Sequence, residues 1–470
     1  NGWVAQKFDG SDIPLHGLST AFKPRFYQRN AVARILRTGH AMLAHAVGAG
    51  KTLSMIMAAM EMRRLGKARR PMIVVQNATL GQFAHAYAQA YPNARIMVAD
   101  SNDLQKERRK AFLARIVSGD WDSVIIAQST FDRLKMSPAA MIAFYNEKID
   151  ELIEALNQAG DELTTKELER AIESTQKKID AILDKQKKKE TDDLITFEEL
   201  GVDALFIDEA HAYKKPLFAT KIGNIVGLNK EASAAGTSTL MKVRHIQGKT
   251  RGRNVVMATG TPVTNTFGEV WHMINFTAPD ILRDAGVPTF DRFASTFGVI
   301  GQVLTTNAGG QPVFKSGFVR FTHRNEFSQL IRSAWDVLTP EDLRAYFDED
   351  AAAAGKPSGL PTLRGGDVRP IVLPLSDGNA EFNDFVKRVY ERWQDMPPRE
   401  RRNYNWVAAM LYQASRAAAI DIRLIFPDAK EEENSTPNNA ARNIYNEYAD
   451  SQQITGTQMV FSDENNALNT

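Results

Sequence analysis

The first group of residues suited to binding or catalysis is a glycine-rich segment, His45 to Thr52 (HAVGAGKT). It follows a short apolar run and precedes a helical pattern. Glycines let the backbone wrap closely round phosphate groups, which the N–H groups and the dipole of a helix start attract. Lys51 would reach the β- and γ-phosphates of ATP, and the Thr52 hydroxyl would bind Mg²⁺. The segment therefore predicts a nucleotide-binding loop, with these residues as its contacts: Gly48, Ala49, Gly50, Lys51 and Thr52.

A pair of adjacent carboxylates, Asp208 and Glu209, follows the apolar run 204–207 and begins the tetrapeptide DEAH. Parallel sheets place their sites at the carboxyl ends of strands. Asp208 would hold Mg²⁺ through water there, and Glu209 would orient and deprotonate the attacking water. A DEAH tetrapeptide alone is common by chance, but together with the phosphate loop it is specific for ATP hydrolysis.

A third motif, Thr259-Gly260-Thr261-Pro262, directly follows the expected strand 254–258. Hydroxyl groups beside the active site are suited to sense the γ-phosphate and to pass that state to another surface. A plain Thr/Gly/Pro turn is the alternative. We group Thr259, Gly260 and Thr261 with His211 as candidate coupling residues.

Tyr27 and Gln28 precede the phosphate loop by about 20 residues. A glutamine amide matches both the donor and the acceptor edge of adenine, and an aromatic ring can stack on the base. A surface glutamine on a helix is the alternative, and the position before the loop favours base binding.

Two polar pairs follow apolar runs where loops would leave the sheet. Gln76-Asn77 follows PMIVV, and Gln128-Ser129 follows SVIIA. They are candidates for contact with a nucleic-acid backbone, and roles in capping or turns are equally compatible with the pattern.

The elements that must position these residues are short apolar strands alternating with helical patterns. Wholly apolar strands separated by helices indicate an α/β fold, a parallel sheet covered on both faces. We expect helices at 27–37 and 52–65 and strands at 41–44, 71–75, 123–127, 204–207 and 254–258.

Residues 140–193 interrupt this alternation. Apolar residues keep helical spacing, a break falls at Gly160-Asp161, and the spacing then resumes, which predicts an inserted antiparallel helical hairpin. The run 185–189 contains four lysines and suits either contact with DNA or a solvated helix end.

The later part of the chain is less regular. We expect loops at 300–316 and 350–368, helices through 376–426, a linker or mobile loop at 428–440 and the start of a strand at 457–463.

Composition narrows the class of protein. A chain of 470 residues exceeds the ~250–300 residues that one core supports, so two or more packed units are expected. Hydrophobic residues make up 43% and charged residues 24%, which fits a soluble globular protein without a membrane helix or signal peptide. The absence of cysteine excludes disulfides and agrees with a reducing cytoplasm. A net charge of +2 means that any phosphate-binding surface is local, and the missing initiator Met suggests a fragment of a longer polypeptide.

The order of these motifs resembles superfamily 2 helicases, and most of all their Swi/Snf-type branch. TGTP followed by Asn265, with Glu269-Val270-Trp271 beyond it, is similar to that branch's third motif and following helix. More narrowly, the chain resembles methylase–helicase proteins of phages and conjugative elements. These carry DEAH followed by an aromatic and a lysine, here Ala212-Tyr213-Lys214-Lys215, a helix ending in the pattern at 415–424 and a strand like 456–463.

The resemblance implies an ATP-driven motor moving on nucleic acid, with duplex DNA as the expected partner, in the cytoplasm of a bacterium or as a phage-encoded protein. It carries over Gln28, Lys51, Thr52, Asp208 and Glu209 as nucleotide residues and Thr259 and Thr261 as coupling residues, and it adds Asn265 to the candidate nucleic-acid contacts. It implies a first RecA-like domain at 1–139 and 194–280, the hairpin at 140–193, a mainly helical extension at 281–450 and the first strand of a second RecA-like domain at 451–470.

One departure from the family pattern concerns that second domain, which supplies arginines to the ATP site. No Gln-x-x-Gly-Arg segment follows Asp463, so we expect the chain as given to bind ATP and hydrolyse it poorly. The missing domain and a fused methylase are expected partners. The alternative hypothesis is a nucleotide-binding scaffold beside a methylase or nuclease, and a P-loop enzyme acting on another substrate agrees less well with TGTP and Gln28.

Overall fold

The computed structural model describes residues 7–99, 103, 106–187, 196–223, 225–226, 228, 230–264, 266–306, 312–353, 371–374, 376–404 and 406–451. The chain divides into two compact units. The first comprises Asn1–Val303 and Ser316–Leu360, and the second Leu304–Lys315 and Pro361–Thr470.

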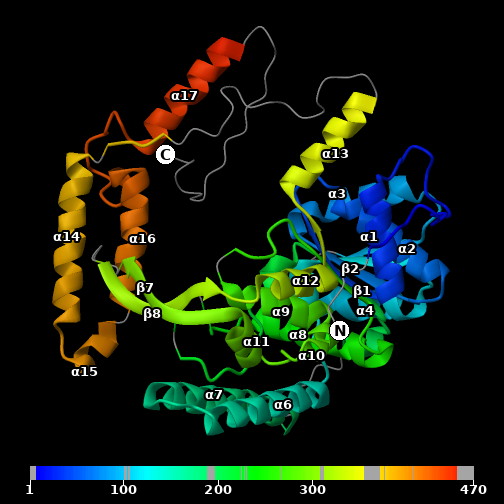
Figure 1. Cartoon of the computed structure of the whole chain (residues 1–470), viewed down its shortest axis with the longest axis horizontal. Coiled ribbons are helices and arrows are strands. Elements are labelled where there is room, and N and C mark those ends of the chain that lie inside the picture. Colours follow the sequence, from blue (N-terminus) through cyan, green and yellow to red (C-terminus); the bar gives the residue numbers. More distant parts are fainter. Residues whose placement is uncertain are drawn as a thin grey trace. The chain divides into compact units, whose positions relative to one another are not determined.

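A sheet forms the centre of the first unit (Figure 1). It has seven strands, in the order β3-β4-β2-β5-β6-β1-β9. All its neighbouring strands run parallel. The continuous apolar runs form these strands because helices cover both faces. The five strands expected from the sequence are confirmed to within a residue at each end, and the full set is β1 (His40–His45), β2 (Pro71–Val75), β3 (Ile96–Ala99), β4 (Ser123–Ala127), β5 (Ala204–Asp208), β6 (Val255–Ala258) and β9 (Trp335–Leu338).

Alternate residues of each strand enter two separate cores. Met42 and Val74 face one core, whereas Leu43 and Ile73 face the other. Residues of α1 (Phe26–Thr38), α2 (Lys51–Arg64) and α3 (Leu80–Ala90) pack in the second core. The first core takes residues of the remaining helices around the sheet, which are α4 (Lys106–Ser118), α5 (Gln128–Arg133), α8 (Ala234–Thr250), α9 (Phe267–Thr277), α10 (Pro279–Asp284), α11 (Phe290–Phe297) and α12 (Arg324–Ala334).

Strand β9 was not expected from the sequence. It lies beside β1, with Met42 opposite Trp335, and it comes from a region where we expected a mainly helical extension. Phe290, Phe293 and Leu330 of the preceding helices are buried in the same core as β1 and β5. These helices and β9 therefore belong physically with the sheet, and α13 (Pro340–Ala353) follows directly.

The loop expected at 300–316 is wrong. β7 (Gly298–Thr306) and β8 (Pro312–Phe321) pair with each other in a separate two-stranded sheet. Glycine, threonine and asparagine suggested a loop, but the β-branched and aromatic residues among them, such as Val303 and Phe314, favour extended structure. Of the second expected loop, residues 350–353 end helix α13, and 354–368 lie outside the described residues.

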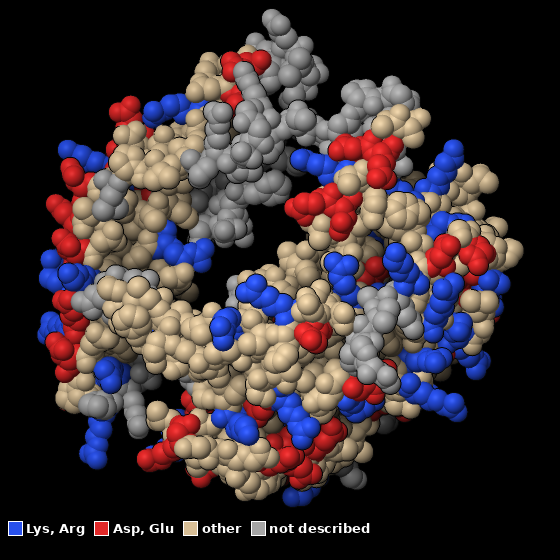
Figure 2. Space-filling model, viewed as in Figure 1, with Lys and Arg blue, Asp and Glu red and all other residues tan. Residues whose placement is uncertain are grey.

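The inserted hairpin is confirmed as α6 (Pro138–Asn157) and α7 (Glu162–Lys187), which pack against each other. Ser137 caps α6 by accepting a hydrogen bond from the Ala140 N–H at 3.2 Å. Acidic and basic side chains are interspersed along the hairpin (Figure 2). Some of them form ion pairs, such as Lys148–Glu151 and Lys177–Glu173. Within the lysine run, Lys185 and Lys187 are exposed, and residues 188–193 lie outside the described part.

The second unit has a small helical core of its own. Phe382 and Val386 of α14 (Asp377–Gln394) pack with Leu411 of α16 (Trp406–Ile420). A short helix, α15 (Pro398–Arg401), lies between them in sequence. These elements confirm the helices expected through 376–426. The expected linker at 428–440 is wrong in its second half, where α17 (Thr436–Ser451) begins after the buried residue Ser435. The strand expected at 457–463 lies outside the described residues.

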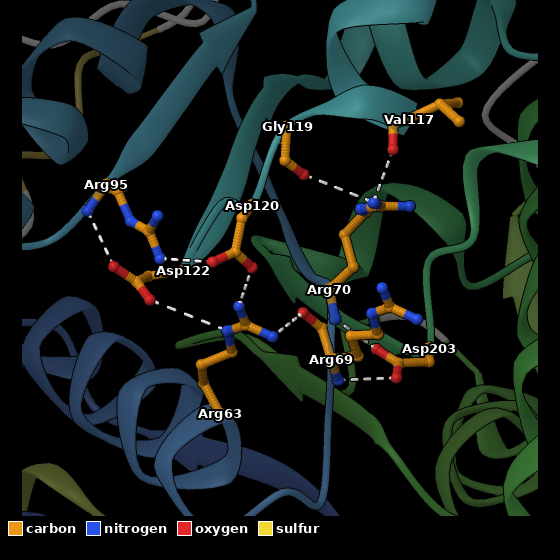
Figure 3. Close-up of polar contacts among 9 residues, drawn as sticks. All are labelled: Arg63, Arg69, Arg70, Arg95, Val117, Gly119, Asp120, Asp122 and Asp203. Carbon is orange, nitrogen blue, oxygen red and sulfur yellow. Dashed lines mark hydrogen bonds and ion pairs between the residues drawn. The ribbon is translucent and has the colours of Figure 1, made fainter.

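Arginine–carboxylate contacts connect the amino ends of four neighbouring strands (Figure 3). Asp203 before β5 accepts hydrogen bonds from the backbone N–H groups of Arg69 and Arg70 before β2, both at 2.7 Å. Asp120 before β4 pairs with Arg95 before β3 at 2.6 Å and also with Arg63. The amino edge of the sheet is thus held by charge-assisted hydrogen bonds, opposite the edge that carries the motifs.

Candidate nucleotide site

The phosphate loop connects β1 to α2, as the sequence predicts. Gly48 and Gly50 have φ angles of 88° and 76°, in the region that favours glycine. The Lys51 Nζ donates to the carbonyl oxygens of His45 at 3.0 Å and Ala46 at 3.3 Å. These acceptors are neutral, and a phosphate group is a stronger partner for an ammonium ion. The loop, the helix start and Lys51 therefore fit a triphosphate.

Gln28 contacts the phosphate loop directly. Its Nε2 donates to the carbonyl oxygens of Ala49 at 3.2 Å and Gly50 at 3.3 Å, and its Oε1 accepts the Arg25 N–H at 2.9 Å. Both amide hydrogens are thus engaged, so in this arrangement Gln28 positions the loop, and only its oxygen has a lone pair left for a base. A Cβ at Gly50 would lie 2.3 Å from this amide nitrogen, so a larger residue would displace the Gln28 side chain as well as strain the left-handed backbone.

Tyr27, the second candidate for the base, is 7% exposed. Its ring stacks on Tyr346 of α13, with centroids 5.8 Å apart and planes at 18°. The structure thus places Tyr27 beside the loop, as expected. One face of its ring is covered by Tyr346, a residue that the sequence did not single out.

The two carboxylates lie at the carboxyl end of β5. Asp208 is opposite Ala258 of β6, and Ala258 is in turn opposite Leu43 of β1, so the strands that carry the three motifs are adjacent. Burial, and then the neighbouring charge of Glu209, raise the pKa of Asp208 to about 6. Glu209 has a φ of 47°, and the reversal of the backbone there directs the chain into the 3-10 helix η3 (Ala210–Tyr213).

A hydrogen-bonded group of side chains joins DEAH to TGTP. The Glu209 Oε2 lies 3.1 Å from the His211 Nδ1, and the same nitrogen lies 2.9 Å from the Thr259 Oγ1. The Thr259 hydroxyl also accepts the Thr261 N–H at 3.1 Å. A Cβ on Gly260 would lie 3.1 Å from Val47, so the small residue permits close approach to the phosphate loop. All four candidate coupling residues are thereby brought to one place.

A second link between the same motifs was missed as a site feature. The Lys214 Nζ lies 3.1 Å from the Glu269 Oε1, and the Glu269 Oε2 accepts the Thr264 N–H at 2.7 Å. Glu269 is 2% exposed. Lys214 belongs to the pattern that resembles phage methylase–helicases, and Glu269 belongs to the pattern that resembles the Swi/Snf-type branch; these resemblances were the available signal.

The candidate nucleic-acid contacts follow β2 and β4, which are neighbours in the sheet. The Gln128 Nε2 donates to the carbonyl oxygen of Asp208 at 3.2 Å, and the Asn77 Oδ1 accepts the Ser129 N–H at 3.2 Å. Two of these side chains thus hold the protein's own backbone, while the Gln76 carbonyl accepts the Thr79 N–H. Asn265 lies outside the described residues.

Lys242 of α8 is a buried cation that sequence reasoning missed. Its Nζ donates to the Phe131 carbonyl at 2.8 Å and to the Ser238 hydroxyl at 3.1 Å, and it lies 4.2 Å from the centroid of the Phe131 ring. Burial lowers the pKa of Lys242 to about 7, opposed by the charge of Asp132. It ties α8 to α5, the helix that begins at Gln128.

Thr52 lies in the first turn of α2 and Asp208 ends β5, and these two residues remain the expected ligands of the magnesium ion. Within the part of the chain that is described, no group of three or more His, Cys, Asp or Glu side chains is placed to hold a metal. Mg²⁺ is commonly bound by one or two protein ligands together with substrate phosphates and waters, and Thr52 and Asp208 would be those protein ligands.

No helix among the described residues is long and apolar enough to cross a membrane.

A phosphate loop, an acid pair and a hydroxyl-rich third motif at the carboxyl edge of one parallel sheet define a P-loop nucleotide-binding protein of the helicase class. A family profile described as "Probable helicase domain" matches residues 34–330. The chain belongs to this family.

Among curated proteins, the chain is similar to "Defense against restriction protein B" of Escherichia phage P1, at 22% identity over 151 residues. That match covers 32% of this chain and 7% of the phage protein. Among solved structures, it is similar to the Sulfolobus solfataricus SWI2/SNF2 ATPase core in complex with dsDNA, at 12% identity and a TM-score of 0.39, covering 93% of this chain and 67% of that one. The UvsW helicase of Bacteriophage T4 matches at 12% identity and a TM-score of 0.27, covering 53% and 57% of the two chains.

Proposed function

We propose that this chain is the motor core of an ATP-dependent DNA translocase. The observation that carries the proposal is the chain of contacts from Glu209 through His211 to Thr259 and Thr261, all within 3.1 Å of the next. It joins the residue suited to activate water with a hydroxyl-rich loop beside the phosphate loop. A site built only to hold a nucleotide has no need of this connection.

In the proposed reaction, Lys51 moves from the loop carbonyls to the β- and γ-phosphates of ATP. Mg²⁺, held by Thr52 and Asp208, would neutralise charge on the phosphates. Glu209 orients a water molecule for attack on the γ-phosphate and accepts its proton. His211 holds the Glu209 carboxylate and reports its state to Thr259.

Duplex DNA is the proposed track. The motifs follow β5, β6 and β1, which are neighbours in the sheet. The polar candidate residues follow β4 and β2, the next strands along the same edge. Gln128 bonds to the backbone of Asp208, so a shift of the catalytic strand end is transmitted to the adjacent candidate contacts. We assign Gln76 and Asn265 to direct contact with the DNA backbone, and Gln128 and Asn77 to positioning. The hydroxyl oxygen of Ser129 is buried, so we assign Ser129 to support of the loop.

The proposed setting is a larger mobile-element protein for DNA modification or protection in the bacterial cytoplasm. A second RecA-like domain, starting at 451–470, would supply charge to the γ-phosphate across a cleft, and a methylase would belong to the same polypeptide. The first RecA-like domain would comprise 1–139 and 194–280, followed by the extension at 281–450, with the hairpin at 140–193 as an insertion.

The test is the rate of ATP hydrolysis with and without duplex DNA, for this chain and for a version extended by the second motor domain. We expect DNA to stimulate the extended form, and Lys51→Ala to abolish nucleotide binding or turnover. If the extended form binds ATP without stimulation by DNA, the translocase proposal is wrong and a nucleotide-binding scaffold is favoured. Turnover that survives Lys51→Ala would overturn the site itself.

A further inference from the structure

The turn between α14 and α16 in the second unit brings arginines together with aromatic rings. Figure 1 shows the short helix α15 at this turn. The indole Nε1 of Trp393, near the end of α14, donates to the Tyr404 carbonyl oxygen at 2.9 Å. The guanidinium of Arg401 lies 5.7 Å from the centroid of the Trp393 ring and donates to the Gln394 carbonyl oxygen at 3.1 Å. These contacts fasten the turn to α14. We call the following residues the arginine–aromatic corner: Arg392, Trp393, Arg399, Arg401, Tyr404 and Trp406.

Two rings of the arginine–aromatic corner face water. Tyr404 is 44% exposed and Trp406 is 56% exposed, whereas the Trp393 ring packs on Tyr390 with centroids 5.5 Å apart. Trp406 begins α16, and the core that α16 shares with α14 is built from other residues of that helix, such as Leu411. A tryptophan ring has a large apolar area, so its exposure forgoes much of the stabilisation that burial would give. Tyr404 and Trp406 therefore offer open aromatic surface to a partner.

The same turn carries a local excess of positive charge. Residues 387–402 include six lysines and arginines against three aspartates and glutamates, an excess of three, whereas the whole chain has a net charge of only +2. α16 contains no acidic residue. Arg392 and Arg399 are exposed, and neither forms an ion pair within the described part of the chain, in contrast to Arg423, which Asp421 holds at 2.7 Å. The charge of the turn is thus open to anionic groups.

Exposed rings beside unpaired guanidinium groups match the chemistry of single-stranded nucleic acid. Unpaired bases stack on such rings whatever their sequence, and arginines pair with the phosphates that connect the bases. A duplex keeps its base faces inside its own stack, so it would leave Tyr404 and Trp406 unused. An acidic protein segment would satisfy the arginines without using the faces of both rings.

We propose that the arginine–aromatic corner binds single-stranded nucleic acid, with bases stacked on Tyr404 and Trp406 and phosphates held by Arg392 and Arg399. The arginine–aromatic corner lies wholly within the second unit, so it is separate from the candidate contacts after β2 and β4 in the first unit. The inference goes beyond the proposed function, because binding here needs no nucleotide in the phosphate loop and no duplex.

The test measures binding of a fluorescein-labelled oligothymidylate of about 20 nucleotides to the whole chain by fluorescence anisotropy, without ATP. Trp406→Ala and Tyr404→Ala should each weaken binding about 5- to 20-fold, as loss of a base stack does. Trp406→Phe keeps a flat ring, so its affinity should stay within about threefold of that of the unaltered chain. Tyr445→Ala, at a 68% exposed tyrosine of α17, is the matched control and should bind normally.

Two further measurements separate stacking from charge. A base stacked on Trp406 should quench the intrinsic fluorescence of the chain, and Trp406→Phe should bind the oligothymidylate without that quenching. Arg392→Gln and Arg399→Gln should each reduce the slope of log affinity against log salt concentration by about 0.7, the value for one phosphate contact on a single strand. Arg442→Gln, at an exposed arginine of α17, is the control and should leave the slope unchanged.

Unchanged affinity in both Trp406→Ala and Tyr404→Ala would overturn the inference, as would an unaltered chain that binds no oligothymidylate. Duplex DNA that binds equally well, with the same dependence on Trp406, would also overturn it. Polyglutamate that displaces the oligothymidylate and is itself weakened by Trp406→Ala would favour an acidic protein partner instead. Failure of the proposed function is distinguishable, because Lys51→Ala should abolish ATP hydrolysis and leave binding of the oligothymidylate unchanged.

Discussion

The Nδ1 of His211 lies 2.9 Å from the hydroxyl oxygen of Thr259, which connects the segment after β5 to the segment after β6. The same ring nitrogen lies 3.1 Å from the Glu209 carboxylate. One histidine therefore contacts both the residue proposed to activate water and the residue proposed to transmit the outcome. The predictions below separate these roles.

Glu209→Gln keeps the size of the side chain and its ability to hydrogen-bond, but removes the base. We expect ATP to bind with nearly unchanged affinity while hydrolysis falls by about 10²–10⁴-fold. Nucleotide affinity and single-turnover hydrolysis, measured on the same preparation of the extended chain, check this. A parallel loss of affinity would show that Glu209 is a structural group instead.

Thr259→Val preserves the shape of a fully buried side chain and removes its hydroxyl. The change breaks the contacts with His211 and the Thr261 N–H, so we expect DNA stimulation of hydrolysis to fall about 2- to 10-fold. ATP affinity should stay within about twofold of normal. Stimulation that persists at full strength would remove Thr259 from the coupling route.

Gln28→Leu removes two hydrogen bonds to the phosphate loop and leaves the Ala49 and Gly50 carbonyls without their partner. We expect affinity to fall by about the same factor, roughly 3- to 30-fold, for ATP and for tripolyphosphate, because the loop itself is disturbed. Selective loss of ATP binding would instead assign Gln28 mainly to the base.

Lys242→Met tests the buried cation through the pH dependence of stability. The folded pKa of Lys242 is lowered to about 7 from its usual 10.5, so the unfolded chain binds more protons between these values and stability rises with pH there. Relative to Lys242→Met, the unaltered chain should gain about 2 kcal/mol of unfolding free energy from pH 7 to pH 9. Urea titrations at both pH values measure it, and a constant difference would mean that Lys242 stays charged on folding.

The strands and the hairpin were predictable because local patterns determine them. PMIVV and SVIIA are short, β-branched apolar runs typical of a strand buried on both faces. Gly160-Asp161 interrupts one helical period between Leu156 and Leu168. The phosphate loop and DEAH were equally predictable from the sequence, because their chemistry depends on residue types at fixed spacing along the chain.

Contacts between segments that are distant in the chain could not be predicted from the sequence. Strand β9 has only four residues, WDVL, and pairs with β1 almost 300 positions earlier. Lys242 looks like an ordinary surface lysine in MKVRH, and only tertiary packing buries it. The double hydrogen bond from Gln28 and the stack of Tyr346 on Tyr27 likewise depend on how α1 and α13 meet the loop.

The arginine–carboxylate contacts at the amino ends of β2, β3, β4 and β5 have a mechanical consequence. They hold together the margin of the sheet that lies opposite the motifs. Because the Asp120 side chain is 63% exposed, salt screens these contacts. High ionic strength should therefore weaken this margin of the sheet.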